Sequence, residues 1–181
     1  MKLFYTAAYS GKKQYQKYYD LVLDAIKECD VDIISPELGG YKKVLSNVEL
    51  RTLKSEREIH YEAIRKGIEL SDAVIIEISQ ECFQLGHEAT LAIMNKKPVF
   101  CLSIHEDFSK KIKNPYFYAA KYNESNVYEL VDTFIDKVNI GKLNERFNLF
   151  LSKRQLEKVS NLAGKLNLTK SEYIRKLIDN S

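Results

Sequence analysis

The sequence predicts an α/β fold, a doubly wound and mostly parallel sheet of the Rossmann type, followed by a small C-terminal unit. Two observations carry this prediction. Strand-like and helix-like segments alternate through residues 1–138, which favours a parallel sheet covered by helices on both faces. The composition changes after Val138, where a different pattern begins. Because 45% of the residues are hydrophobic, the chain can form a substantial core.

The elements of the first region follow from the spacing of apolar residues. Residues 12–29 predict a helix, since Tyr15, Tyr19 and Val22 recur on one helical face. Gly39 and Gly40 indicate a loop. The expected strands are 2–8, 31–35, 73–78, 98–103 and an extended stretch, 116–122. The expected helices are 12–29, 48–70, about 87–95 and 125–138, with loops over 37–47 and 105–113.

The segment after Val138 predicts a linker, 139–145, and a compact unit, 146–181. Alternating apolar residues predict a short strand over 146–151, and Ser152 caps the helix that follows. Thr169 and Glu172 have the spacing of a capping box and open a second helix. A strand and two short helices bury too little apolar surface to be stable alone. The unit is therefore expected to pair, most simply with its own copy, in a homodimer or larger oligomer.

Charge and cysteine content narrow the choice of partners. The net charge is +3, but nine Lys/Arg against four Asp/Glu place +5 on residues 139–181 and leave −2 on the rest. This asymmetry favours an anionic partner, with a solvated basic surface as the alternative. The three cysteines do not have the spacing of metal ligands, so no metal site is expected. The sequence shows no signal-peptide pattern and no long apolar run, which predicts a cytoplasmic protein without membrane contact.

Glu88 is the main candidate for chemistry. It follows Gly86 and His87, after the buried strand 73–78, in the first turn of a helix expected to begin at about His87. Ligands of open α/β sheets lie at the carboxyl ends of the strands. Gly86 is expected to let the backbone approach a ligand closely. The alternative is that Glu88 only complements the helix dipole.

Residues 3–137 resemble the nucleoside 2-deoxyribosyltransferase superfamily, and within it most closely the 2'-deoxynucleoside 5'-phosphate N-hydrolases. The matching segments are 3–11, 59–60, 71–80, 85–88, 95–102 and 109–112. The resemblance implies that Glu88 attacks or stabilises the anomeric carbon of a 2'-deoxynucleotide or deoxynucleoside, as an N-glycosidase or deoxyribosyltransferase without a cofactor. A fixed carboxylate suits an oxocarbenium-like transition state. A sugar without a 2'-oxygen reaches that state more easily.

The resemblance also places a nucleotide loop after the first strand. The loop carries Ala7, Tyr9, Ser10 and Gly11, without the arginine usual in the family, while Lys12 and Lys13 remain nearby. A phosphate near the following helix N-terminus would suit these residues. Other residues expected at the substrate are Tyr5, Gly86, His87 and Ser109, the last of which matches a serine that reaches a neighbouring subunit's phosphate site. The alternative for Tyr5 and Tyr9 is a purely structural role. The alternative for His87 is a polar surface residue that does not contact substrate.

The second carboxylate of the family, its proposed general acid, matches Ile64. Glu62 is the nearest acidic residue and is the candidate to replace it. Two residues along a helix correspond to about 200° of rotation, so Glu62 takes this role only if the helix is shifted or irregular.

Residues 146–178 resemble the ribbon-helix-helix domains of small repressors, on the segments 147–152 and 168–175. The resemblance implies an antiparallel ribbon in the DNA major groove, with Arg146 and Asn148 facing the bases. Thr169 and Lys170, at the start of the second helix, would contact phosphates. Phe150 is unusual on a base-reading face, and a unit that only dimerises the enzyme is the alternative.

Two functions from different classes remain open at this point. One is a nucleotide or nucleoside N-glycosidase that its C-terminal unit assembles into an oligomer. The other is a transcription regulator whose first domain senses a nucleotide without cleaving it. The retained Glu88 favours the enzyme, whereas Ile64 and the missing loop arginine favour the regulator.

Overall fold

The computed structural model describes residues 1–141 and 149–179. The chain forms two compact units, Met1–Lys142 and Leu143–Ser181.

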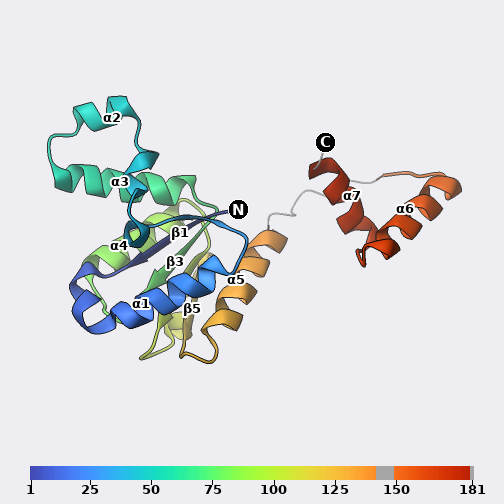
Figure 1. Ribbon diagram of the computed structural model, residues 1–181. Coiled ribbons are helices and arrows are strands. Elements are labelled where there is room, and N and C mark those ends of the chain that lie inside the picture. Colours follow the sequence, from blue (N-terminus) through green and yellow to red (C-terminus); the bar gives the residue numbers. More distant parts are fainter. Residues whose placement is uncertain (142–148, 180–181) are drawn as a thin grey trace. The chain divides into compact units, whose positions relative to one another are not determined.

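The first unit contains a single five-stranded sheet in the order β2-β1-β3-β4-β5 (Figure 1). Its strands are β1 (Lys2–Ala7), β2 (Asp32–Ile34), β3 (Ala73–Glu77), β4 (Val99–Ser103) and β5 (Phe117–Lys121). All four neighbouring pairs are parallel. The predicted α/β class is therefore confirmed. The strand order reverses between β1 and β3, the place where open α/β sheets bind ligands at the carboxyl ends of their strands.

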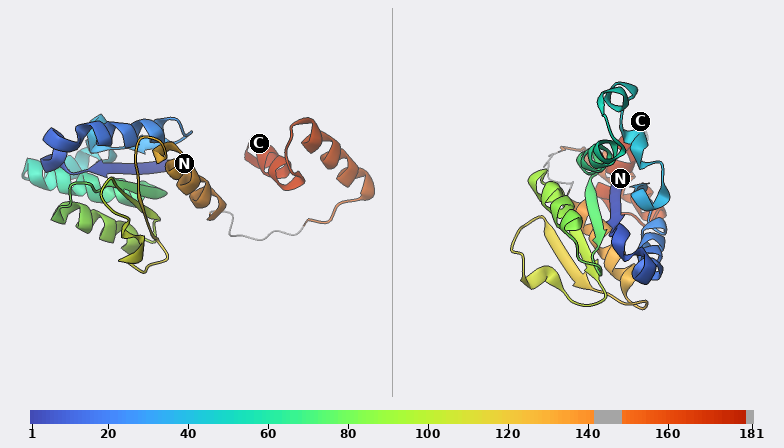
Figure 2. Two further views of the ribbon diagram at one scale, coloured as in Figure 1. Left: turned by 90° about the horizontal axis from the view of Figure 1, so that it is seen from below. Right: turned by 90° about the vertical axis from the view of Figure 1, so that its left-hand side faces the viewer.

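Helices cover both faces of this sheet (Figure 2). The helices of the unit are α1 (Lys12–Lys27), α2 (Asn47–Thr52), α3 (Glu56–Leu70), α4 (Phe83–Met94) and α5 (Val127–Gly141). Alternate residues of a strand point to opposite faces. Leu3, Tyr5 and Ile75 accordingly pack in one core with α1 and α5. Phe4 and Ile76 pack in the other core, with α3 and α4.

The region predicted as one long helix, 48–70, is two helices. The short α2 ends at Thr52, and α3 begins after Ser55, whose side chain accepts a hydrogen bond from the backbone N–H of Glu58. Serine in this position caps a new helix rather than continuing an old one. The predicted loop 37–47 contains two short 3-10 turns, η2 (Pro36–Leu38) and η3 (Tyr41–Val44).

The helix that carries Glu88 begins earlier than expected, because α4 starts at Phe83. Glu88 therefore lies in the second turn of the helix and not in the first. Gly86 lies inside α4, and a Cβ atom added there would meet no atom within 4 Å. The expected close approach of a ligand to the Gly86 backbone stays a prediction, because the space beside Gly86 is open.

In the C-terminal unit, α6 (Lys153–Lys165) packs against α7 (Lys170–Asp179). The Ser152 side chain caps α6, and Thr169 and Glu172 form the predicted capping box. Residues 149–151 are not in a strand, and the rest of the predicted strand lies outside the described residues. A ribbon strand obtains its hydrogen bonds from a second chain, so a single chain gives it no partner.

The predicted linker, 139–145, begins too early. Residues 139–141 belong to α5, which ends at Gly141, and 142–145 lie outside the described residues. Glycine is a poor residue inside a helix and a common one at its end.

Within residues 1–141 and 149–179, no helix combines the length and apolar character needed to cross a membrane. The same residues contain no group of three or more His, Cys, Asp or Glu arranged to hold a metal ion.

Candidate functional site

Glu88 is a buried carboxylate on the face of α4 that packs toward the sheet. Its side chain is only 1% exposed. The Gln84 side chain, one turn earlier, donates from Nε2 to Glu88 Oε1 at 2.8 Å. Glu88 Oε2 is buried and has no hydrogen-bond partner. Buried polar atoms are nearly always paired, so this oxygen is free to accept a hydrogen bond from a bound molecule.

Burial raises the pKa of the Glu88 carboxyl above its ordinary value. The Gln84 amide and the Thr6 hydroxyl oppose this rise. Thr6 lies near the end of β1 and pairs with Ile76 of β3. Glu88 therefore sits beside the two strands at which the sheet order reverses.

Glu88 lines a cavity of about 370 Å³ between α3 and α4. The other lining residues are His60, Tyr61, Ile64, Phe83, Gln84, His87 and Leu91. A cavity of this size is at the lower end of the range for small-molecule sites, about 300–1,000 Å³. The His87 ring lies nearly parallel to the rings of Tyr61 and Phe83, with interplanar angles of 20° and 5°. Flat aromatic and apolar walls suit a planar ligand.

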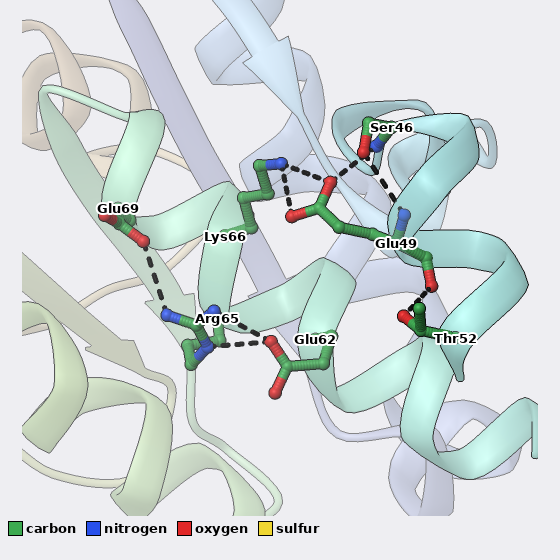
Figure 3. Close-up of polar contacts among 7 residues, drawn as sticks. All are labelled: Ser46, Glu49, Thr52, Glu62, Arg65, Lys66 and Glu69. Carbon is green, nitrogen blue, oxygen red and sulfur yellow. Dashed lines mark hydrogen bonds and ion pairs between the residues drawn. The ribbon is translucent and has the colours of Figure 1, made fainter. Parts of the chain in front are cut away.

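Glu62, expected as a second catalytic carboxylate, is not among the residues that line this cavity. Its Oε2 accepts from Arg65 Nε at 2.9 Å and lies 2.8 Å from Arg65 Nη2 (Figure 3). The helix α3 is regular here, so the rotation between positions 62 and 64 is retained. Ile64 faces the cavity instead, so the catalytic role expected of Glu62 stays a prediction that this geometry does not favour.

The predicted nucleotide loop lies at the carboxyl end of β1. Tyr9 and Ser10 are exposed, and Ala7 is half-buried. Gly11 is buried, and a Cβ atom there would lie 2.2 Å from the Tyr19 hydroxyl and 2.6 Å from Gln80 Cβ. Glycine at position 11 is therefore required for the loop to pack against α1 and the segment after β3. None of these loop residues lines the cavity beside Glu88.

The other residues predicted to contact substrate, Tyr5, His87 and Ser109, lie in three different environments. Tyr5 is fully buried, and its hydroxyl donates to the Tyr19 carbonyl at 2.8 Å, so its role is in the core. His87 lines the cavity beside Glu88. Ser109, in the short turn η4 (Phe108–Lys110), is exposed, and its backbone N–H donates to Asp107 Oδ1 at 2.8 Å.

Glu77, at the end of β3, is a second buried carboxylate that the sequence interpretation did not select. It accepts hydrogen bonds from the Tyr122 hydroxyl at 2.9 Å and from the Ser79 hydroxyl. Burial raises the pKa of Glu77 to about 6, although these hydrogen bonds oppose the rise. Because strand side chains alternate, Glu77 points toward the α1 and α5 face, whereas Glu88 lies on the α3 and α4 face.

His60 and Gln84 are the other residues that the sequence interpretation missed. His60 Nδ1 lies 2.6 Å from the Tyr41 hydroxyl, and His60 Nε2 lies 3.4 Å from Gln84 Nε2. A signal for both existed in helical spacing. His60 precedes Ile64 by one turn of α3, and Gln84 precedes Glu88 by one turn once α4 is known to start at Phe83.

Of the predicted DNA contacts, Arg146 and Asn148 lie outside the described residues. Thr169 and Lys170 are exposed at the start of α7. The Glu172 carboxylate already accepts the backbone N–H of Thr169 at 2.6 Å, which lowers the pKa of Glu172.

No protein-family model and no curated protein matches the sequence. Among solved structures, a CMP N-glycosidase from Clostridium botulinum is similar to this chain, with a TM-score of 0.45 and 12% sequence identity. The similarity covers 77% of this chain and 99% of that one.

Proposed function

We propose that the first unit is an enzyme that cleaves the N-glycosidic bond of a 2'-deoxynucleotide or deoxynucleoside in the cavity beside Glu88. The observation that carries this proposal is the buried, unpaired Oε2 of Glu88 in a cavity with aromatic walls. The resemblance of residues 3–137 to nucleoside 2-deoxyribosyltransferases and deoxynucleotide N-hydrolases gives the same substrate class.

The proposed reaction depends on the Glu88 carboxylate, whose buried position disfavours its ionised form. As the bond between C1' and the base nitrogen breaks, its electron pair leaves with the base, and C1' becomes positive. An ionised Glu88 stabilises that charge strongly, because few water molecules compete with it in a buried site. Water then supplies a hydroxyl group to C1', and its proton goes to the base. Since burial raises the pKa of Glu88, we expect activity to increase with pH as this carboxyl ionises.

The test is release of free base from a panel of deoxynucleoside monophosphates and deoxynucleosides. Glu88→Gln keeps the shape of the side chain but not its charge, so we expect the rate to fall by about a hundredfold or more. Glu62→Gln is the matched control, because Glu62 pairs with Arg65 away from the cavity. Base release by Glu88→Gln at the wild-type rate would contradict the proposal.

We also propose that the C-terminal unit joins two copies of the chain and binds duplex DNA. Among its described residues only Ala163 is a buried hydrophobic residue, while Leu156, Leu166 and Leu177 are about half exposed. In a unit this small, such apolar side chains suit burial against a second copy. The excess of basic residues in the same segment suits the phosphate backbone of DNA.

The alternative function is a regulator in which the first unit only senses a nucleotide. A protein that binds deoxynucleotides and DNA but releases no base would favour that alternative.

A further inference from the structure

A row of polar side chains extends from Glu88 through Gln84 and His60 to Tyr41. Gln84 Nε2 lies 2.8 Å from Glu88 Oε1 and 3.4 Å from His60 Nε2, and His60 Nδ1 lies 2.6 Å from the Tyr41 hydroxyl. The row joins η3, α3 and α4, three elements that lie apart in the sequence.

The carboxylate determines which atoms donate along this row. An ionised carboxylate only accepts, so the Gln84 group that faces it is the NH₂ group. The same nitrogen faces His60, and His60 Nε2 must therefore be the acceptor. A neutral imidazole has a single N–H, which is then on Nδ1 and donates to the Tyr41 oxygen. Burial and the nearby Lys42 lower the pKa of His60, in agreement with a neutral ring.

We propose that His60 is a positioning residue that acts on Glu88 through Gln84. His60 Nε2 holds one N–H of the Gln84 amide, so that the other N–H is directed at Glu88 Oε1 and Oε2 is left for the substrate. The catalytic part of this role rests on the proposed function, whereas the effect on Glu88 itself does not. The other titratable groups near His60 are Tyr41 and Lys42 of η3, Glu56 and Tyr61 of α3, and His87 and Glu88 of α4.

The first measurement is the titration of Glu88 by ¹³C NMR in the full chain without substrate, with Glu88→Gln to assign the signal. The Gln84 amide lowers the pKa of Glu88. We therefore expect His60→Leu to raise that pKa, and Gln84→Leu to raise it at least as much. The double variant should match Gln84→Leu, because His60 acts only through Gln84.

His60→Gln tests the same idea with a side chain that can replace both ring nitrogens. Its oxygen accepts from Gln84 and its amide donates to Tyr41, so the pKa of Glu88 should stay as in the wild type. His105→Leu is the matched control, because His105 Nε2 also meets a tyrosine hydroxyl, that of Tyr15, at 3.2 Å but does not line the cavity. This variant should leave the titration of Glu88 unchanged.

The second measurement is base release. His60→Leu should reduce kcat by up to about tenfold with little change in KM, the size expected for loss of one hydrogen bond between neutral groups. An unchanged titration of Glu88 in His60→Leu, or additive effects in the double variant, would overturn the role of His60. A wild-type protein that releases no base would overturn the proposed function, while the titration would still decide whether His60 positions Glu88.

Discussion

Two buried glutamates, Glu77 at the carboxyl end of β3 and Glu88 on α4, differ in how many hydrogen bonds their oxygens accept. Glu77 accepts hydrogen bonds from Tyr122 and Ser79, and the Ser79 hydroxyl in turn accepts the backbone N–H of Ile104 at 3.0 Å. Glu88 accepts from Gln84 at Oε1, the Thr6 hydroxyl lies near the same carboxyl group, and Oε2 has no hydrogen-bond partner. A saturated carboxylate holds β3, β4 and the end of β5 together, whereas an unsaturated one remains available to a ligand.

The raised pKa of Glu77 predicts a loss of stability as pH increases. Folded Glu77, with a pKa of about 6, binds its proton more tightly than the unfolded chain, whose value is 4.5. Its contribution is therefore most favourable below pH 4.5 and declines as pH rises through 6, by about 2 kcal/mol. Glu77→Gln removes this titration, so its stability relative to wild type should improve by about 2 kcal/mol between pH 4.5 and 7.

Urea unfolding followed by tyrosine fluorescence at the two pH values measures this difference. Glu81→Gln, which changes an exposed carboxylate in the next loop, is the control and should show no such trend. A constant difference between Glu77→Gln and wild type across this pH range would contradict the prediction.

At the scale of elements, each of the two helices that form the cavity contains a glycine, and the surroundings of the two glycines differ. Gly67 of α3 faces β1, where an added Cβ atom would lie 2.7 Å and 2.9 Å from ring carbons of Phe4. Phe4 is fully buried and has no room to move. Gly86 of α4 faces open space. Packing requires glycine at the first position and not at the second.

A pair of alanine variants separates these effects. Gly86→Ala should stabilise the protein by about 0.5–1 kcal/mol, because alanine is the better helix former. Gly67→Ala has the same gain in helix propensity but overpacks the core, with a typical cost of about 1–3 kcal/mol. Thermal unfolding of both variants provides the comparison. A Gly67→Ala protein more stable than wild type would show that α3 moves away from β1 at little cost.

At the scale of the whole molecule, the two units differ in how many apolar residues they bury. The first has apolar cores on both faces of its sheet. The described part of the second has two amphipathic helices and a single buried hydrophobic residue, Ala163. A unit of this size gains most of its burial from association.

The full chain is therefore predicted to be at least a dimer. Leu156→Lys should lower its order of association, because it places a charge on an apolar surface that needs a partner. Asn161→Lys adds the same charge on α6 at an exposed polar position and is the control. Sedimentation velocity at micromolar concentration measures both, and a monomeric wild-type chain would exclude this assembly.

Binding to duplex DNA is predicted to be weak and strongly dependent on salt. Each phosphate neutralised contributes about −0.9 to the slope of log affinity against log salt concentration. Lys170→Ala should reduce the magnitude of that slope by about this amount on every sequence, whereas Lys113→Ala in the first unit should not. Absence of a mobility shift at low salt would leave the C-terminal unit with dimerisation alone.

The parallel α/β class could be predicted from the amino-acid sequence, because apolar runs at strand and helix spacing specify which faces are buried before any contact is known. The sequence also indicated the capping box at Thr169 and singled out Glu88. The residues that surround Glu88 became known from the packed helices. The start of α4 at Phe83 places Gln84 one turn before Glu88, and the regular α3 directs Glu62 to Arg65 and His60 to the cavity. Helical spacing gives the relative directions of side chains on one helix, but where α4 begins and which face each helix turns to the cavity depend on packing against the sheet.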